Sequence, residues 1–336
     1  LVLKDYFMHT GDVALLREFL PKIRRILEEF SRYADARGLV NFPMEYWSFF
    51  DWSYERNGHS LSGKTSAPLN FLYLIALKTY EKLSLEAGDV EGQDGFQPTI
   101  LRLAVSLDEV FFNRETGRLS DYIEAGEHSR LSSQLAHALA LIAGECRAGI
   151  QNDLSAGLND SNLLIPELYL HYFVFAAQKI VGSTKNGLER IRKYWGKIIE
   201  AGSPTIWEFG VYRPGKDAIE GKGSLCHGFS TSPVDFFQTV ILGVIPLRPG
   251  FMEFSLDPHA FDLQFAEGRV PTPHGNIAVA WKRVPEGISV SLQVPKGCLA
   301  VTPENGSFGP GNHNFRIGND SDEPHEILLE TAHGFS

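Results

Sequence analysis

The hydrophobic period of this 336-residue chain changes once, near Pro246, and this change limits the possible folds more than any other feature. Before it, apolar residues recur at three- and four-residue intervals, as at Leu16, Leu20, Ile23 and Leu27. Such recurrence places apolar side chains on one face of an α-helix. Helical spacing occurs in residues 12–36, 67–87, 98–111, 129–143, 163–181, 185–201 and 232–242. Because loops with Gly, Pro, Asn or Asp separate these segments, they predict an all-α array of helical hairpins.

After Pro246 the pattern becomes an alternation of apolar and polar residues. This alternation predicts half-buried strands, and Pro285-Glu286-Gly287 between two of them predicts a hairpin turn. The expected strands lie in residues 251–258, 263–273, 275–284, 287–295 and 313–318. We therefore expect a two-domain α + β chain, with a helical domain at 1–245 and an antiparallel β-sandwich at 246–336.

The first twelve residues, LVLKDYFMHTGD, have the pattern of the last turns of a helix that ends near Gly11. Residue 1 is Leu, and no charged segment with a cleavage site follows, so this is not a signal peptide. We expect the chain to begin inside an element whose earlier part is absent.

Composition excludes several classes of partner. The net charge is −10 without a basic run, which argues against nucleic acid, and no apolar run approaches the ~20 residues of a membrane helix. Three widely spaced cysteines, Cys146, Cys226 and Cys298, argue against a disulfide framework and a cysteine-based zinc site. We expect no cofactor or metal. The compartment stays open, with the cytoplasm favoured, and an oligomer is compatible with the sequence.

The first stretch that a core does not require is FPMEYWSFFDWSYERN, at 42–57. It interrupts the helical period and mixes Tyr46, Trp47, Phe49, Phe50, Trp52 and Tyr54 with Glu45, Asp51 and Glu55. One interpretation is a loop packed over the end of the helical array. The other is a sugar site, in which aromatic faces cover the apolar side of a ring and carboxylates accept hydrogen bonds from hydroxyls.

The second stretch is TIWEFGVYRPGKDAIEGKGSLCHGFS, at 205–230. Glu208 follows Trp207 at the entry of a long polar loop, and His227 ends that loop in a Gly-flanked turn. The plain interpretation is a surface acid and a structural histidine. Alternatively, an indole against the carboxylate desolvates it and raises its pKa, as in acid–base catalysis.

Five segments together resemble bacterial α-L-rhamnosidases of glycoside hydrolase family 78. The similarity keeps the family's order and spacing from residue 1 to about residue 295. The segments are WSFFDW at 47–52, TIWE at 205–208, SLCHGFS at 224–230, VILGVIPLRPGF at 240–251 and EGRVPTPHGNIAVAW at 267–281. The resemblance implies an (α/α)₆ six-hairpin toroid, incomplete at its N-terminus here, followed by a β-sandwich.

The resemblance also implies an inverting hydrolysis of terminal α-L-rhamnose from an oligosaccharide or other glycoside. It implies Glu208 as general base and His227 as a sugar-binding residue. The tryptophan of the −1 subsite falls in 47–52, where Trp47 is favoured over Trp52. Asp51 and Trp207 complete the expected substrate-binding residues.

The family's general-acid motif, with Arg and Trp, lies upstream of this chain's first residue, and nothing here matches it. We therefore expect the chain to carry the base half of a site and to require a missing N-terminal portion. Two alternatives remain open: a non-catalytic sugar-binding remnant, and another toroid enzyme such as a polysaccharide lyase. A lyase would use a Tyr or His base and a cation near the uronate, for which the loop offers only Arg213, Lys216 and Lys222.

Overall fold

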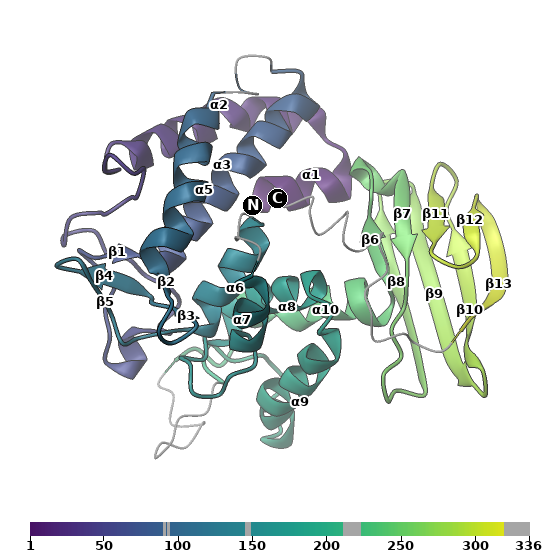
Figure 1. Ribbon diagram of the computed structural model, residues 1–336. Helices are drawn as coiled ribbons and strands as arrows, with labels where there is room; N and C mark the ends of the chain where they lie inside the picture. Colours follow the sequence, from purple (N-terminus) through teal and green to yellow (C-terminus); the bar gives the residue numbers. More distant parts are fainter. Residues whose placement is uncertain (90–91, 93–94, 145–148, 211–222, 319–336) are drawn as a thin grey trace. The chain divides into compact units, whose positions relative to one another are not determined.

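The computed structural model describes residues 1–336 except 90–91, 93–94, 145–148, 211–222 and 319–336 (Figure 1). The chain forms two compact units. One unit is Leu20–Ser232, and the other joins Leu1–Phe19 to the described residues from Pro233 onward. The expected domain boundary at 245/246 stays a prediction. Among the described helices, none combines the length and apolarity that crossing a membrane requires.

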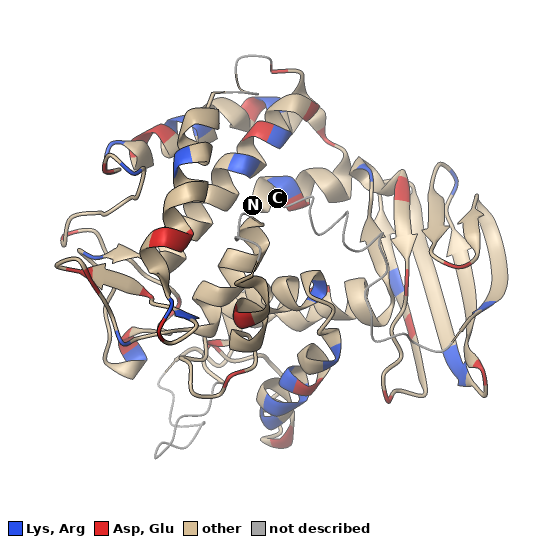
Figure 2. Ribbon diagram, in the orientation of Figure 1, with Lys and Arg blue, Asp and Glu red and all other residues tan. Residues whose placement is uncertain are grey.

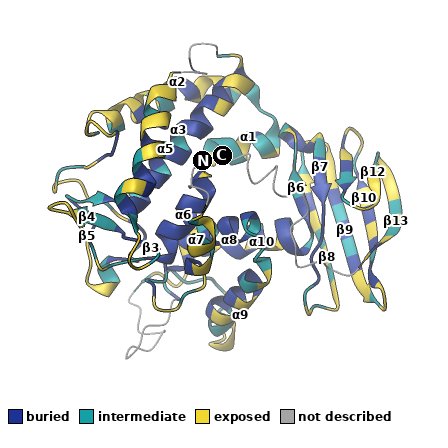
Figure 3. Cartoon of the chain, in the orientation of Figure 1, coloured by how far each residue is buried: buried dark blue, intermediate teal, exposed yellow. Residues whose placement is uncertain are grey.

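The Leu20–Ser232 unit is built around α6 (Gln134–Ala143), in which every residue is buried (Figure 3). α6 packs against α3 (Ala67–Ala87) and α8 (His171–Ile180), α3 packs against α5 (Gln97–Phe111), and α8 packs against α9 (Thr184–Glu200). A short helix, α7 (Gln151–Gly157), also contacts α6. A helix that is apolar on nearly all sides is stable only in such a buried position, whereas α9 carries Lys and Arg along its outer face (Figure 2).

Most helices confirm the periodicity, but three boundaries differ for local reasons. α2 (Val13–Ser31) ends before residue 36, because the Asp35 side chain accepts the backbone N–H groups of Arg37 and Leu39 and forms a turn instead. α6 begins at Gln134 rather than 129, where Ser133 caps it by accepting from Ala136 N. The segment expected at 163–181 is helical only from η2 (Leu168–Leu170) and α8, since Pro166 disfavours helix before it.

The sequence pattern did not predict two small sheets that this unit contains. One has the order β1-β4-β5, and the other pairs β2 with β3. The strands are β1 (Thr65–Ser66), β2 (Phe112–Asn113), β3 (Arg118–Leu119), β4 (Tyr122–Glu124) and β5 (Glu127–His128). Segments of two or three residues are too short to show an alternation.

The second unit contains two four-stranded sheets with the orders β13-β10-β9-β8 and β12-β11-β7-β6. Their strands are β6 (Val244–Pro246), β7 (Glu253–Leu256), β8 (Phe265–Thr272), β9 (Gly275–Val284), β10 (Gly287–Val294), β11 (Leu299–Thr302), β12 (Gly306–Phe308) and β13 (Gly311–Ile317). Val279, Trp281, Val290 and Leu292 belong to the buried face of the first sheet. The expected hairpin is confirmed, since Val284 pairs with Gly287 across two residues. One pair departs from the antiparallel expectation: β7 and β11 run parallel.

The first helix, α1 (Val2–Thr10), belongs to this second unit. It ends, as expected, at Gly11, which has a φ of 69°. A Cβ atom at this position would lie 3.5 Å from the backbone nitrogen of Gly250, which is an ordinary van der Waals contact. His9 meets Phe251 of η5 (Pro249–Phe251) edge to face, with 5.2 Å between ring centroids. A side chain at position 11 would be strained by that φ, which glycine adopts without cost.

Candidate active site

The two stretches singled out in the sequence meet through one hydrogen bond. Trp52 Nε1 donates to Glu208 Oε1 at 3.1 Å, across 156 residues of sequence. Trp52 lies in a series of turns that ends in η1 (Glu55–Asn57), and Glu208 lies in the loop that follows α9. The structure therefore places residues 42–57 beside the loop that carries Glu208.

The Glu208 carboxylate is oriented from both sides. Its second oxygen, Oε2, accepts the backbone N–H of Ser224 at 2.8 Å, while Glu208 N donates to Ser224 O at 2.9 Å. His227 N donates to Ile206 O at 2.8 Å, so 206–208 and 224–227 run side by side. Each carboxylate oxygen has one protein donor among the described residues, and each keeps a lone pair for a further donor. Such an arrangement can accept a proton from a bound water or hydroxyl.

A buried hydrogen-bond network anchors the aromatic segment. Tyr54 is fully buried, and its hydroxyl lies 3.0 Å from Ser133 Oγ, at the N-cap of α6. Ser133 donates from both N and Oγ to Asp121 Oδ1, at 3.0 and 2.9 Å. Burial raises the pKa of Asp121 to about 7. These hydrogen bonds hold the aromatic segment in place at Tyr54, two residues from Trp52.

Asp51 and Trp52 both adopt the left-handed backbone region, with φ of 45° and 59°. This conformation is uncommon for a bulky residue and collects at functional sites. Asp51 is only 5% exposed, and its Oδ2 has no hydrogen-bond donor among the described residues. Burial, followed by the charges of Glu167 and Glu208, raises the pKa of Asp51 to about 7, against a hydrogen bond from the Tyr169 backbone.

Two sets of aromatic rings lie on these segments. Trp47 is 58% exposed; its ring centroid lies 4.3 Å from that of Phe49 and 5.6 Å from that of Trp52. His227 lies 4.9 Å from the exposed Phe229, which in turn lies 5.2 Å from Tyr169. Exposed aromatic faces of this kind can cover the apolar side of a sugar ring.

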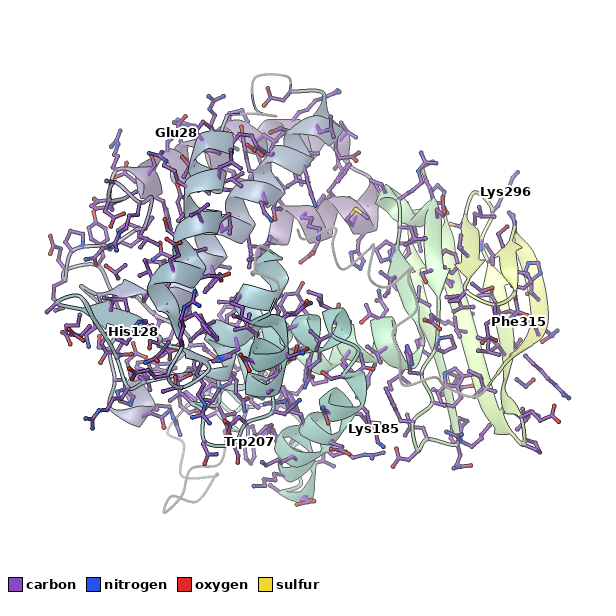
Figure 4. All side chains as sticks on the ribbon, in the orientation of Figure 1. Glu28, His128, Lys185, Trp207, Lys296 and Phe315 are labelled. Atoms are coloured by element: carbon purple, nitrogen blue, oxygen red, sulfur yellow. The ribbon has the colours of Figure 1, made fainter. Side chains whose placement is uncertain are left out.

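Trp47, Trp52 and Trp207 each donate an indole hydrogen bond to a different residue. Trp47 Nε1 donates to Glu55 at 3.1 Å, whereas the indole bonded to Glu208 is that of Trp52. Trp207, labelled in Figure 4, donates to Ser203 Oγ at 2.8 Å within its own loop. The loop cations Arg213, Lys216 and Lys222, and also Cys146, lie outside the described residues. Cys226 and Cys298 are free thiols.

Sequence reasoning missed two charged residues beside Glu208. Glu167 is fully buried and forms an ion pair with Arg56. An acid after Pro166 in the apolar run LLIPELYL was the available signal, because an acid is rarely buried unless it is paired. In the described part of the chain, no group of three or more His, Cys, Asp or Glu side chains could hold a metal ion.

Known proteins similar to this chain are longer than it. An alpha-L-rhamnosidase of Alteromonas sp. (strain LOR) is 24% identical over 305 residues, which cover 87% of this chain and 32% of that protein. An alpha-L-rhamnosidase of Formosa agariphila is 24% identical over 330 residues, covering 93% and 34%. The crystal structure of the GH78 family rhamnosidase of Bacillus sp. GL1 superposes with a TM-score of 0.79 at 24% identity, covering 89% and 32%. The chain thus spans about a third of the length of the curated relatives it matches.

Two family profiles cover most of the sequence. Residues 1–241 match the bacterial alpha-L-rhamnosidase 6 hairpin glycosidase domain, and residues 243–303 match the bacterial alpha-L-rhamnosidase C-terminal domain. These matches confirm the predicted fold class, a six-hairpin helical part followed by a β-domain. The chain therefore belongs to the bacterial α-L-rhamnosidase family.

Proposed function

We propose that this chain carries the general-base half of an inverting α-L-rhamnosidase site, which releases terminal α-L-rhamnose from a rhamnoside. The observation that carries the proposal is the hydrogen bond from Trp52 to Glu208. It joins an aromatic segment suited to a sugar ring to a carboxylate that, among the described residues, accepts from two donors and keeps a lone pair on each oxygen. Family membership supports the same substrate class.

In the proposed reaction, Glu208 accepts a proton from a water whose oxygen attacks the anomeric carbon. The bond from that carbon to the leaving oxygen breaks, and a carboxylic acid on the opposite face protonates the leaving oxygen. The products are rhamnose of inverted configuration and the free alcohol. The two carboxyl groups must lie roughly 6.5–9.5 Å apart to accommodate the water. We assign the acid to polypeptide that precedes Leu1, which would be this chain's partner in the complete site.

The remaining site residues bind the sugar in this proposal. Trp52 and Trp47 present aromatic faces, His227 holds a hydroxyl of the −1 sugar, and Trp207 shapes the loop through Ser203. Asp51, buried beside Glu208, offers an oxygen without a protein partner among the described residues to a hydroxyl of the substrate.

The test uses this chain joined to the sequence that precedes it in its gene, here called the extended polypeptide. Glu208→Gln keeps the shape of the side chain but cannot accept the proton, so hydrolysis should fall by roughly 10²–10⁴-fold with rhamnose binding retained. Glu200→Gln, an exposed acid at the end of α9, is the matched control. Proton NMR of the first product gives its anomeric configuration.

Three outcomes would contradict the proposal. Wild-type turnover by Glu208→Gln would exclude Glu208 as the general base. A first product of retained configuration would exclude inversion. Rhamnose binding by the extended polypeptide without hydrolysis would favour a non-catalytic sugar-binding protein.

A further inference from the structure

Glu167 is a fully buried carboxylate that contacts both segments of the candidate site. It precedes η2, and its backbone N–H donates to Ser53 Oγ at 2.9 Å, next to Trp52. Its Oε1 lies 3.4 Å from Arg56 Nε in an ion pair, and its Oε2 accepts Gly210 N at 3.4 Å. Gly210 is two residues beyond Glu208. Glu167 therefore joins Ser53, through its backbone, and Arg56, through its side chain, to the backbone of the loop that carries the proposed base.

Arg56 reaches the same loop by a second route. Its guanidinium carbon lies 3.8 Å from the ring centroid of Phe209, the residue directly after Glu208. A planar guanidinium over an aromatic face is attracted by the ring and stacks on it, which an ammonium group does less well. Because an isolated buried charge is costly, Glu167 also requires this cation nearby. Arg56 thus serves a buried acid and an aromatic ring at once.

The loop backbone fits closely against its surroundings at two glycines. A Cβ at Gly210 would lie 2.7 Å from a methyl carbon of Leu168, the neighbour of Glu167. A Cβ at Gly223 would lie 2.4 Å from the Phe209 ring and 2.9 Å from Glu208 Oε2. All three distances are shorter than a Cβ atom can approach a non-bonded atom, so neither position accepts a side chain unless its neighbours shift. The backbone at Gly210 therefore packs closely against Leu168, and the backbone at Gly223 packs closely against Phe209 and Glu208.

We propose that Glu167 and Arg56 are positioning residues for Glu208: Glu167 holds the Gly210 backbone, and Arg56 holds the Phe209 ring, so that the Glu208 carboxylate keeps its place opposite the Trp52 indole. This inference rests on the proposed function, since it assigns the pair an effect on the base. A misplacement of about 1 Å can lower a rate by about 10²-fold, so the pair matters for turnover without touching substrate.

The first experiment measures hydrolysis by the extended polypeptide with three substitutions. Glu167→Gln keeps an oxygen for Gly210 N–H but removes the charge that holds Arg56. Arg56→Lys keeps the charge but loses the planar stack, and Phe209→Leu keeps an apolar side chain without the ring. We expect kcat to fall roughly 10–100-fold for Glu167→Gln and roughly 3–30-fold for the other two, with KM changed less than threefold. Asp160→Asn, which weakens the Arg118–Asp160 ion pair elsewhere in the same unit, is the control.

The second experiment separates positioning of the base from a general structural role. Azide needs no deprotonation, so it should restore turnover to Glu208→Ala by attacking the anomeric carbon as the leaving oxygen departs with the acid's proton. If Glu167 acts through the base, Glu167→Gln should cause no further loss in the Glu208→Ala background with azide. An equal fractional loss in both backgrounds would overturn the inference, as would wild-type kcat in all three single variants.

The same measurements distinguish a failure of this inference from a failure of the proposed function. Full hydrolysis by Glu208→Ala, or its failure to respond to azide, would count against Glu208 as the base, and the inference would fall with it. Loss of activity in Glu208→Ala with azide rescue, but no effect of Glu167→Gln or Arg56→Lys, would overturn the positioning role alone.

Discussion

Trp52 and Glu208 share a 3.1 Å hydrogen bond, although Trp52 adopts a backbone conformation that is uncommon for a bulky side chain. The strain is maintained because the segment is anchored two residues later by the buried Tyr54 hydroxyl. Local backbone strain that is held by surrounding contacts is a frequent property of functional sites.

Replacing Trp52 with Phe should lower kcat of the extended polypeptide roughly 10–100-fold. The ring remains, but Glu208 Oε1 loses a donor, and a hydrogen bond to a charged group contributes about 1.5–3 kcal/mol. Steady-state kinetics on p-nitrophenyl α-L-rhamnopyranoside measures the effect. Trp281→Phe, which removes a buried indole hydrogen bond to Ile241 in the other unit, is the control. An unchanged kcat for Trp52→Phe would mean that the hydrogen bond has no catalytic consequence.

Replacing His227 with Ala should weaken sugar binding and turnover together, by about 1–3 kcal/mol in kcat/KM, if the imidazole holds a hydroxyl. Calorimetric titration with rhamnose and steady-state kinetics test this expectation. His227 also precedes a short 3₁₀ turn, η3 (Gly228–Ser230), and contacts Phe229. Unchanged kinetics with a lower Tm would assign it a structural role instead.

Asp51 should make the free energy of unfolding depend on pH. Its pKa is about 7 in the folded chain against an ordinary value of 3.8, so the folded state binds the proton more tightly. The resulting stabilisation is complete below pH ~4 and is lost as the pH rises through about 7. The side chain introduced by Asp51→Asn does not titrate, so the variant's free energy of unfolding does not lose this contribution. Its free energy of unfolding relative to wild type should therefore increase between pH 4.5 and 8, by roughly 2–4 kcal/mol.

Urea unfolding of both proteins at the two pH values measures this difference. Asp153→Asn, at an exposed position, provides the reference for a simple change of surface charge. A constant difference between Asp51→Asn and wild type across this range would show that Asp51 is ionised throughout. Glu167→Gln should lower the pKa of Asp51, because the charge of Glu167 is the second cause of its rise.

The chain expressed alone should show no measurable release of p-nitrophenol from p-nitrophenyl α-L-rhamnopyranoside, whereas the extended polypeptide should be active. An inverting enzyme needs its acid and its base in the same step, and here only Glu208 is assigned. Size-exclusion chromatography should show the chain aggregating, or associating with the upstream polypeptide when it is added. Full activity of the chain alone would require the acid to be found among Glu45, Asp51, Glu55, Glu124 and Glu127.

The sequence alone determined the classes of element and their order. Helices such as α3 and strands such as β9 follow from side-chain periodicity, which is a local property, and Ala67-Pro68 and Gly88 mark the ends of α3. The residue types at 47–52 and 205–208 were also enough to select both stretches that meet in the structure. Short strands such as β1 and β5 were missed because two residues carry no period.

Only the tertiary structure decided which side chains meet. Trp47 and Trp52 lie in one aromatic segment, but in the folded chain Trp47 donates its indole hydrogen bond to Glu55 and Trp52 donates to Glu208. Likewise, no local pattern predicts that Glu167 is buried against Arg56, or that Asp51 titrates near neutral pH. Periodicity depends on neighbours along the chain, whereas burial and pairing depend on how the chain folds back on itself. The pairs on which the proposed chemistry depends, Trp52–Glu208 and Arg56–Glu167, join segments more than a hundred residues apart.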